Sequence, residues 1–287
     1  MQTVTEMAYA KINLFLDVID RRADGFHSIR TIMQTISLSD TVTLAAEASK
    51  YNSITLKIDG NNSLSSGCDN IVYKAAEAYL LRSGINADVN IRLLKSIPIG
   101  AGLGGGSADA AATLRALNTI FKAFSFDELI EISGDIGSDV PFCLIGGTAL
   151  CEGRGEVVNP LPLLPKMHFV VALGDERVST PTAYARLDEL YNGFDGESYV
   201  PRRLNIEKDK PICKSCLSKV LYNIFESTAP SSALLLKERL LMLGAQAALM
   251  SGSGPSVFAV FDNAALASSA RDALVSDGIY AEYAVSI

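Results

Sequence analysis

A glycine-rich segment is the part of this sequence whose residue types most clearly point to chemistry. Residues 98–109 read PIGAGLGGGSAD, and five of the seven residues from Gly100 to Gly106 are glycine. Glycine adopts positive φ angles readily and lets bare backbone approach a ligand. Residues 108–118 are rich in Ala and Leu, which predicts a helix that opens near Ser107. The unpaired N–H groups of its first turn would face the segment, so the pattern predicts a phosphate cradle.

Two other phosphate-binding motifs fit this segment less well. A Walker A loop needs a Gly-Lys-Ser/Thr step, but no lysine lies between Lys95 and Lys122. A G-x-G-x-x-G match starts at Gly100, but a dinucleotide-binding fold would place a strand after the helix, and residues 127–133 predict a second helix. A nicotinamide or flavin cofactor is therefore disfavoured. The plain alternative is a flexible loop or a tight helix entry, and five glycines make that entropically costly.

A lysine interrupts an apolar stretch near the N-terminus. Residues 8–19 alternate as a strand does, and Lys11 lies inside them. A charge there is costly unless it is paired or belongs to a site. The alternative is a strand end whose ammonium reaches solvent. Asn13 lies two residues further on, which places it on the same face of the strand.

An aspartate follows the second predicted helix, in the segment GSDVP at residues 137–141. Ser138 is a plausible N-cap there and Pro141 suits a first turn, so Asp139 could simply stabilise a helix N-terminus. A lysine beside Asp139 would instead keep that carboxylate ionised. Together with a phosphate cradle, such a pair suits phosphoryl transfer to a hydroxyl, with Mg²⁺ and backbone N–H groups holding the nucleotide phosphates.

Three further features allow more than one interpretation. His27 follows an aromatic residue and could recognise the edge of a base, or it could be an ordinary histidine in a surface turn. The Gly/Ser loop at residues 250–255 precedes a predicted strand and could approach a substrate or be a tight turn. Cys213 and Cys216 lack a second pair of ligands, so a zinc site is disfavoured.

Composition excludes several classes of protein. The 287 residues are 48% apolar and 20% charged, so the chain can bury a sizeable core. The net charge of −7 argues against a dedicated nucleic-acid binder and against a polybasic membrane patch. No apolar run is long enough to cross a membrane, and no signal peptide is visible. Five scattered cysteines do not suggest a disulfide framework, so a reducing cytoplasm is the expected location.

The predicted elements suggest an α+β protein. Strands are expected at 41–44, 54–58 and 89–93, with a polar loop at 61–67 and helices at 70–82 and 127–133, the last capped by Ser125. In the second half, strands are expected at 168–173, 257–261 and 280–285, and helices at 182–191, 219–225, 231–243 and 264–276. A domain boundary is expected within residues 152–165, and residues 199–219 predict a solvated, locally basic surface. This order suggests a small α+β sandwich for the second half.

Three features together resemble the GHMP small-molecule kinases: the glycine-rich loop 98–107, the lysine strand near the N-terminus and the SGSGP segment 251–255. Seven segments, in order along most of the chain, are more similar still to one member of these kinases. They read AKINLFLDV (10–18), RRADGFH (21–27), IPIGAGLGGGSADAAATLRALN (97–118), IGSDVPF (136–142), EGRGE (152–156), VSTPTAY (178–184) and SGSGPSVFAVF (251–261). The resemblance implies a two-domain α+β fold with the active site in the cleft. The first domain, residues 1–157, would be ribosomal-protein-S5-domain-2-like and bind ATP. The second, residues 158–287, would be a ferredoxin-like α/β sandwich for the substrate.

The resemblance also implies a role for each matching residue. Asp139 would be the catalytic aspartate and Lys11 its partner. The phosphates of ATP would bind the loop Pro98, Ile99, Gly100, Ala101, Gly102, Leu103, Gly104, Gly105, Gly106, Ser107 and Ala108. His27 would recognise a cytosine, Asn13 would contact the substrate, and Tyr184 would lie against the base. Phe26 replaces the tyrosine that commonly precedes the histidine, so stacking survives without the hydroxyl. Residues 192–216 match no family motif.

The implied activity is transfer of phosphate from ATP, with Mg²⁺, to the 2-hydroxyl of a cytidine diphosphate-linked methylerythritol. No nucleic acid, membrane or protein-held metal site is expected. One alternative is a GHMP kinase for another small alcohol, such as homoserine, mevalonate or a sugar. A second is a non-catalytic nucleotide-binding module with a relic site, which the joint presence of lysine, aspartate and glycine loop disfavours. An assay with and without the cytidyl group separates these alternatives.

Overall fold

Two long strands begin the chain in the computed structural model, which describes all residues except 61–63, 177 and 195. β1 spans Gln2–Arg21 and β2 spans His27–Ala48. The turn between them closes with a hydrogen bond from the Arg22 N–H to the Phe26 carbonyl at 2.8 Å, and Gly25 adopts a φ of 84°. The strands predicted at 8–19 and 41–44 are parts of β1 and β2. The predicted polar loop at 61–67 lies partly outside the described residues.

The chain forms two compact units, each assembled from several segments. Unit 1 contains residues 1–10, 39–99 and 104–145, and unit 2 contains residues 11–38, 100–103 and 146–287. Both β1 and β2 therefore contribute residues to each unit, as does the glycine-rich segment. The predicted division into domains 1–157 and 158–287 is a division along the sequence, and it stays a prediction.

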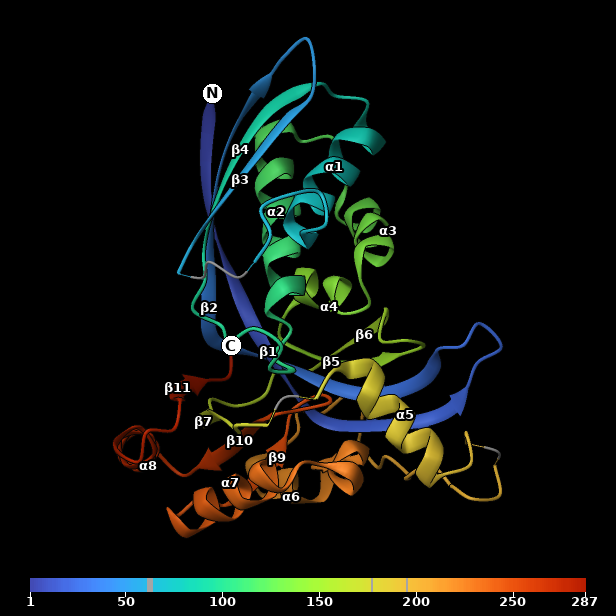
Figure 1. Cartoon of the computed structure of the whole chain (residues 1–287), viewed down its shortest axis with the longest axis vertical. Helices are drawn as coiled ribbons and strands as arrows, with labels where there is room; N and C mark the ends of the chain where they lie inside the picture. Colours follow the sequence, from blue (N-terminus) through green and yellow to red (C-terminus); the bar gives the residue numbers. More distant parts are fainter. Residues whose placement is uncertain (61–63, 177, 195) are drawn as a thin grey trace. The chain divides into compact units, whose positions relative to one another are not determined.

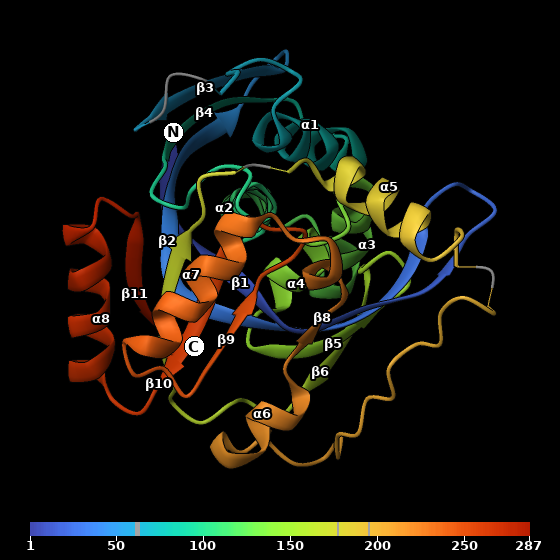
Figure 2. The ribbon, with the colours of Figure 1, turned by 60° about the horizontal axis from the view of Figure 1, so that its bottom comes forward.

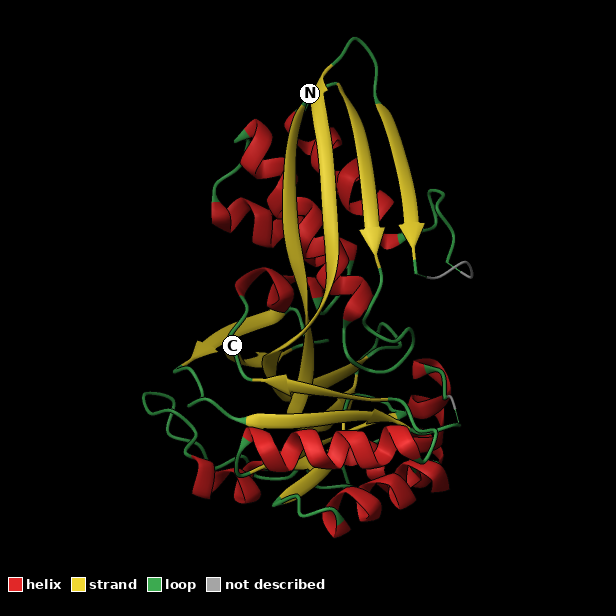
Figure 3. Cartoon of the chain, turned by 90° about the vertical axis from the view of Figure 1, so that its left-hand side faces the viewer, coloured by secondary structure: helices red, strands yellow, loops and turns green. Residues whose placement is uncertain are grey.

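In unit 1, helices gather on one side of a strand layer (Figures 1 and 3). β4 (Ala87–Leu94) pairs antiparallel with the last part of β2 and parallel with β3 (Ser53–Asp59). The helices are α1 (Ile71–Ser83), α2 (Gly105–Phe121), α3 (Phe126–Ile136) and α4 (Val140–Ile145). Alternate residues of β4, such as Val89 and Ile91, are buried against these helices, as the alternating sequence pattern requires.

The helix ends in unit 1 follow from local sequence. Ser125 caps α3 as expected, because its hydroxyl accepts the Glu128 N–H at 3.3 Å and the Glu128 carboxylate accepts the Ser125 N–H at 2.7 Å. α2 begins at Gly105, two residues before the predicted opening near Ser107. Its N-cap, Gly104, has a φ of 67° and no side chain that could cap the helix, which leaves the first-turn N–H groups to a ligand or solvent.

In unit 2, a four-stranded antiparallel sheet has the order β11-β7-β10-β9. Its strands are β7 (His168–Leu173), β9 (Ala247–Met250), β10 (Ser256–Phe261) and β11 (Ala281–Val285). All six residues of β10 are buried. Val257 and Ala259 pack into the core shared with α7 (Ser231–Met242) and α8 (Ala264–Ser276), while Phe258 packs on Phe169. Figure 2 shows α7 and α8 beside this sheet.

The remaining elements of unit 2 include several that the sequence pattern did not predict. They are β5 (Thr148–Glu152), β6 (Val157–Leu161), α5 (Thr180–Leu190), η1 (Lys214–Cys216), α6 (Leu217–Val220), β8 (Tyr222–Asn223) and η2 (Ile224–Thr228). The EGRGE segment is the turn of the β5–β6 hairpin. The single helix predicted over 219–225 is wrong, because β8 interrupts it to pair in parallel with Phe15 and Leu16 of β1.

No helix in the described part of the chain is both long and apolar enough to span a membrane.

Candidate active site

The predicted lysine lies in a buried polar row on β1. Lys11 is only 5% exposed, so its ammonium does not simply reach solvent. Its Nζ donates to Asn13 Oδ1 at 2.8 Å, and Asn13 Nδ2 donates to Thr31 Oγ1 at 2.8 Å. The Thr31 hydroxyl in turn donates to the Phe15 carbonyl at 2.6 Å. Lys11 and Asn13 therefore share one face of the strand, as their spacing predicts, and each is oriented by a hydrogen bond.

Residues 100–103 of the glycine segment lie against this strand. The Lys11 N–H donates to the Leu103 carbonyl at 2.9 Å. The Ser256 hydroxyl donates to the Ala101 carbonyl and the Ser251 hydroxyl to the Gly102 carbonyl, the latter at 3.3 Å. These bonds hold the backbone of residues 101–103 in a fixed conformation, as a preorganised phosphate cradle requires.

The Gly/Ser loop predicted at 250–255 packs directly on the glycine segment. A Cβ added to Gly102, whose φ is 73°, would lie 2.3 Å from the Ser251 carbonyl oxygen. A Cβ added to Gly252 would lie 3.2 Å from Gly102 Cα. The Asn13 N–H donates to the Ser251 hydroxyl at 3.3 Å. The two loops thus meet backbone to backbone, and only glycine fits at Gly102 without movement.

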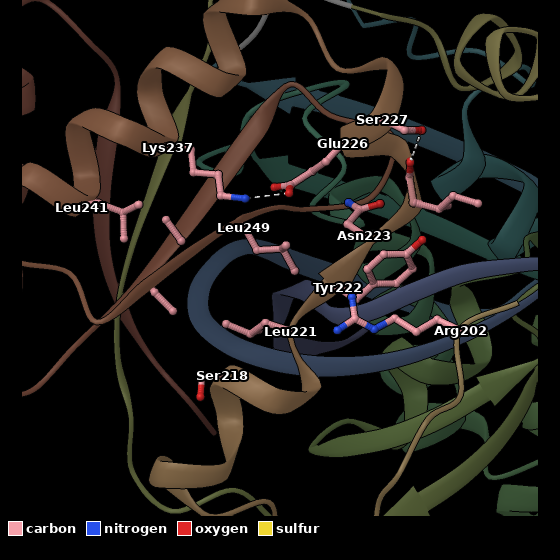
Figure 4. Close-up of a pocket in the computed structure, with 13 residues that line it drawn as sticks. Arg202, Ser218, Leu221, Tyr222, Asn223, Glu226, Ser227, Lys237, Leu241 and Leu249 are labelled. Atoms are coloured by element: carbon pink, nitrogen blue, oxygen red, sulfur yellow. Dashed lines mark hydrogen bonds and ion pairs between the residues drawn. The ribbon is translucent and has the colours of Figure 1, made fainter. Parts of the chain in front are cut away.

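Two residues that were not predicted from the sequence hold the Gly/Ser loop in place through hydrogen bonds to its backbone. Asn223 is 3% exposed, and its amide donates to the carbonyls of Met250 at 2.7 Å and Gly252 at 2.8 Å. Glu226 accepts the Met250 N–H at 3.0 Å and pairs with Lys237 at 2.6 Å. Figure 4 shows these side chains along a groove between η2, α7 and β9. The sequence contained no indication of this role, because the Gly/Ser loop that they bind is more than twenty residues away.

Asp139 occupies the N-cap position of α4 in unit 1. Its carbonyl accepts the Cys143 N–H at 3.1 Å, and the Val140 N–H bonds to the Gly137 carbonyl at 3.1 Å. The N-cap predicted at Ser138 is therefore wrong by one residue, since α4 begins at Val140. Asp139 is partly exposed at the end of a tight turn. Its approach to Lys11, which belongs to unit 2, stays a prediction.

A buried charge cluster underlies the start of α2 in unit 1. Lys95 bonds to Asp40 and, at 2.7 Å, to Asp109, and all three side chains are buried. Asp40 also accepts the N–H groups of Ser96 at 2.5 Å and Ile97 at 2.7 Å. A Cβ added to Gly105 would lie 3.4 Å from Lys95 Nζ. The cluster therefore ties the end of β4, the middle of β2 and the first turns of α2 together.

The charges of this cluster do not balance. Burial lowers the pKa of Lys95, but attraction to Asp109 and Asp40 outweighs it and leaves that pKa raised. Burial raises the pKa of Asp109 well above its ordinary value, and the neighbouring Asp40 carboxylate adds to the rise. Asp109 Oδ1 is one of the few buried side-chain oxygens in the described residues without a hydrogen-bond partner. One ammonium thus compensates two carboxylates only in part.

His27 starts β2 in an aromatic setting. It is 8% exposed, and its ring stacks on Tyr184 with centroids 4.6 Å apart and meets the edge of Phe194 at 5.6 Å. Its Nε2 lies 2.7 Å from Asp188 Oδ1. Phe26, in contrast, is 56% exposed, and the Arg154 guanidinium lies 5.4 Å from the centre of its ring. The structure thus brings His27 and Tyr184 together and leaves Phe26 at the surface.

Part of the segment expected to be a solvated surface, residues 199–219, instead contacts β1. The Tyr199 hydroxyl donates to buried Asp17 of β1, which also accepts the Arg202 N–H at 2.7 Å. Cys213 and Cys216 form a disulfide, a pairing not foreseen from five scattered cysteines. Among the described residues, no group of three or more His, Cys, Asp or Glu side chains is placed to hold a metal ion.

Comparison with known proteins agrees with these features. Residues 70–147 match the model of the GHMP kinases N terminal domain, and residues 230–279 match that of the GHMP kinases C terminal domain. A 4-diphosphocytidyl-2-C-methyl-D-erythritol kinase from Acetivibrio thermocellus is 38% identical over 92% of each chain. A protein of the same name from Caldicellulosiruptor saccharolyticus is 41% identical over 93% of this chain and 91% of its own.

Solved structures show the same relationship. A crystal structure of a 4-(cytidine 5'-diphospho)-2C-methyl-D-erythritol kinase matches 99% of each chain with a TM-score of 0.73 and 31% identity. The Methanococcus jannaschii mevalonate kinase, at 13% identity and a TM-score of 0.72, shares the fold over 100% of this chain and 99% of its own. The fold is therefore the two-domain α+β fold of the GHMP kinases. The chain is an ATP-dependent phosphotransferase with an alcohol acceptor, and it belongs to the 4-diphosphocytidyl-2-C-methyl-D-erythritol kinase family of the GHMP kinases.

Proposed function

We propose that this enzyme transfers the γ-phosphate of ATP to the 2-hydroxyl of 4-diphosphocytidyl-2-C-methyl-D-erythritol, a step of the non-mevalonate route to isoprenoid precursors. The identity of 38–41% to relatives that carry this name, over about nine-tenths of the chain, is the observation on which the proposal depends. The ordered setting of His27, a side chain able to pair with a base edge, supports a substrate that carries a nucleobase. The predicted place of action is the cytoplasm.

The glycine segment supports the role proposed for residues 98–108 in holding ATP phosphates. Gly102 has a positive φ and lies against the Ser251 carbonyl without room for a Cβ, so glycine there lets the segment pack on the Gly/Ser loop, which holds its backbone in one conformation. The uncapped first turn of α2 offers N–H groups and a partial positive charge. The proposed ATP-binding and substrate domains, residues 1–157 and 158–287, each contain one of the two matched family segments.

The proposed chemistry is an in-line displacement. The substrate's 2-hydroxyl oxygen forms a bond to the γ-phosphorus, the bond between that phosphorus and the β,γ-bridging oxygen breaks, and ADP leaves. Asp139 accepts the hydroxyl proton as general base. Lys11 offsets negative charge that develops near the transferred phosphoryl group. Asn13, which holds Lys11 Nζ at 2.8 Å, would orient that ammonium and contact the substrate.

The residues fit a Mg²⁺ ion that arrives with the nucleotide. Mg²⁺ keeps several waters and binds substrate phosphates through few protein groups, so the nucleotide phosphates proposed to lie at residues 98–108 would supply most of its ligands other than water. When bound, the ion would neutralise charge on the phosphates of ATP.

Coupled ADP release tests the proposal. The assay compares 4-diphosphocytidyl-2-C-methyl-D-erythritol with the same alcohol lacking the cytidyl group, and with homoserine, mevalonate and a sugar. Turnover only with the cytidyl compound is the expected result. Turnover with another alcohol alone, or nucleotide binding without turnover on any alcohol, would contradict the proposed substrate.

A further inference from the structure

The hydrogen bond between His27 and Asp188 bears on which nucleobase the enzyme accepts. We propose that Asp188 is a positioning residue that holds the proton of His27 on Nε2, so that Nδ1 offers a lone pair to the 4-amino group of cytosine and disfavours the 4-carbonyl of uracil. This inference rests on the proposed function, because it assumes that His27 contacts the base.

Helix α5 brings Asp188 to the histidine. Tyr184 and Asp188 are four residues apart on α5, so they share one face of the helix. Tyr184 stacks on the His27 ring, and Asp188 Oδ1 lies 2.7 Å from Nε2. Ser179 fixes the start of α5 by accepting the Thr182 N–H at 3.2 Å. The ring is therefore fixed in both tilt and rotation by one helix.

An unusual turn after α5 brings a second aromatic side chain to the His27 ring. Asn192, Gly193 and Phe194 have φ angles of 47°, 67° and 60°, a left-handed conformation that an aromatic residue rarely adopts. The Gly193 N–H bonds to the Asp188 carbonyl at 2.8 Å, and the Phe194 N–H bonds to the Tyr191 carbonyl at 2.8 Å. Phe194 reaches the His27 ring edge-on at 5.6 Å. Such strain persists where surrounding structure enforces it, often at binding sites.

The carboxylate determines which ring nitrogen carries the proton. An ionised carboxylate only accepts hydrogen bonds, so Nε2 must donate to Asp188. In a neutral imidazole Nδ1 then carries the lone pair. His27 Nδ1 has no hydrogen-bond partner among the described residues and is not one of their buried unpaired atoms. Nδ1 is thus the ring nitrogen left to accept a hydrogen bond from a ligand.

Cytosine and uracil differ at the position that such an acceptor would read. Cytosine presents a 4-amino donor and uracil a 4-carbonyl acceptor. The lone pair of His27 Nδ1 facing the 4-carbonyl oxygen of uracil would leave both acceptors without a donor. Sites that bind a substrate through such a hydrogen bond reject an analogue that cannot form it. A stacked aromatic side chain alone would accept both pyrimidines, because each has a π face.

Arg21 makes a substitution at Asp188 informative. Arg21 Nη1 lies 3.7 Å from Asp188 Oδ2. In Asp188→Asn the amide oxygen would turn toward this guanidinium, which only donates, and the amide NH₂ would face Nε2. The His27 proton would then move to Nδ1, and the ring would offer a donor where it had offered an acceptor. Glu189→Gln, an exposed charge loss on the same helix, is the matched control.

The first readout is the protonation of His27 itself, followed by ¹⁵N NMR of the imidazole at the assay pH. The chain has only two histidines, and His168→Gln assigns the spectrum. Wild type and Glu189→Gln should carry the proton on Nε2 alone, and Asp188→Asn on Nδ1. A wild-type spectrum with Nδ1 protonated, alone or together with Nε2, would overturn the proposal whether or not the enzyme turns over.

The second readout is selectivity, the ratio of kcat/KM for the cytidyl substrate to that for its uridyl analogue. Asp188→Asn should lower this ratio roughly 10–100-fold with little change in the KM for ATP. An unchanged ratio in a variant whose tautomer has moved would refute the inference alone. If wild type turns over neither substrate, the proposed function fails, and binding of CDP against UDP to the same variants still decides the role of Asp188.

Discussion

The backbone N–H of Lys11 donates to the carbonyl oxygen of Leu103 at 2.9 Å. This bond joins the strand that carries the predicted catalytic lysine to the segment predicted to hold phosphate. The Lys11 side chain, in turn, is oriented by Asn13. A shift of residues 101–103 would therefore move both the cradle and the strand, so the two parts of the site are preorganised together.

Replacing Gly102 should disrupt this arrangement. Gly102→Ala places a Cβ 2.3 Å from the Ser251 carbonyl oxygen in a left-handed conformation, so we expect a loss of about 2–5 kcal/mol in the free energy of unfolding or a raised KM for ATP. Gly100→Ala is the control, because Gly100 also has a positive φ but has nothing within 4 Å of its added Cβ. Urea unfolding and ATP titration of both variants measure the difference. Equal losses in Gly102→Ala and Gly100→Ala would show that the positive φ, and not the contact with Ser251, makes glycine necessary at position 102.

Removing the proposed base should separate chemistry from binding. Asp139→Asn should lower kcat by about 10²–10⁴ and leave nucleotide affinity nearly intact. The N-cap role of the residue is preserved, because asparagine caps helices as well as aspartate. Steady-state kinetics and a nucleotide-binding titration check both parts. A kcat like that of wild type would remove Asp139 from the mechanism.

His27→Ala should weaken recognition of the cytidyl group. We expect a raised KM for the cytidyl substrate with a smaller change in kcat, since the ring is proposed to contact a part of the substrate remote from the reacting hydroxyl. His168→Ala, a substitution of the other histidine, serves for comparison. If the KM for the cytidyl substrate does not change in His27→Ala, His27 does not bind the cytosine.

The two carboxylates around Lys95 should differ in their effect on stability. Asp40→Asn breaks a buried pair and weakens the bonds to two backbone N–H groups, so we expect a loss of about 3–5 kcal/mol. Asp109→Asn leaves the pair of Lys95 and Asp40 intact and should cost about 1 kcal/mol or less near pH 4.

The pH dependence of Asp109→Asn follows from the raised pKa of the carboxyl. The folded state holds the Asp109 proton more tightly than the unfolded state, whose value is near 3.8. Wild-type stability contributed by this group is therefore present below that value and is lost as pH rises toward the folded pKa. Relative to wild type, Asp109→Asn should become more stable from pH 4 to pH 7 in urea unfolding. The opposite trend would mean that Lys95 keeps Asp109 ionised.

Local features of the site were accessible from the sequence. The glycine segment, the cap at Ser125, and the shared strand face of Lys11 and Asn13 depend on neighbours within a few residues. Asp188 could have been suspected from its spacing of four from Tyr184 on a predicted helix. Nothing local indicated Asn223, Lys95 or Asp17, whose partners are distant in the chain. The helix predicted over 219–225 failed because tertiary pairing with β1 overrode its local propensity.

The sequence by itself determined the family and the strands and helices that carry most of the predicted residues, and it predicted phosphate binding at residues 98–108. These depend on backbone preference and periodicity, which act over a few residues. Tertiary structure decided that Gly102 meets Ser251 without room for a Cβ, that Asp109 is buried beside a second carboxylate, and that Asp188 faces His27. The reason is physical: close packing and desolvation depend on side chains that meet only when distant segments fold together.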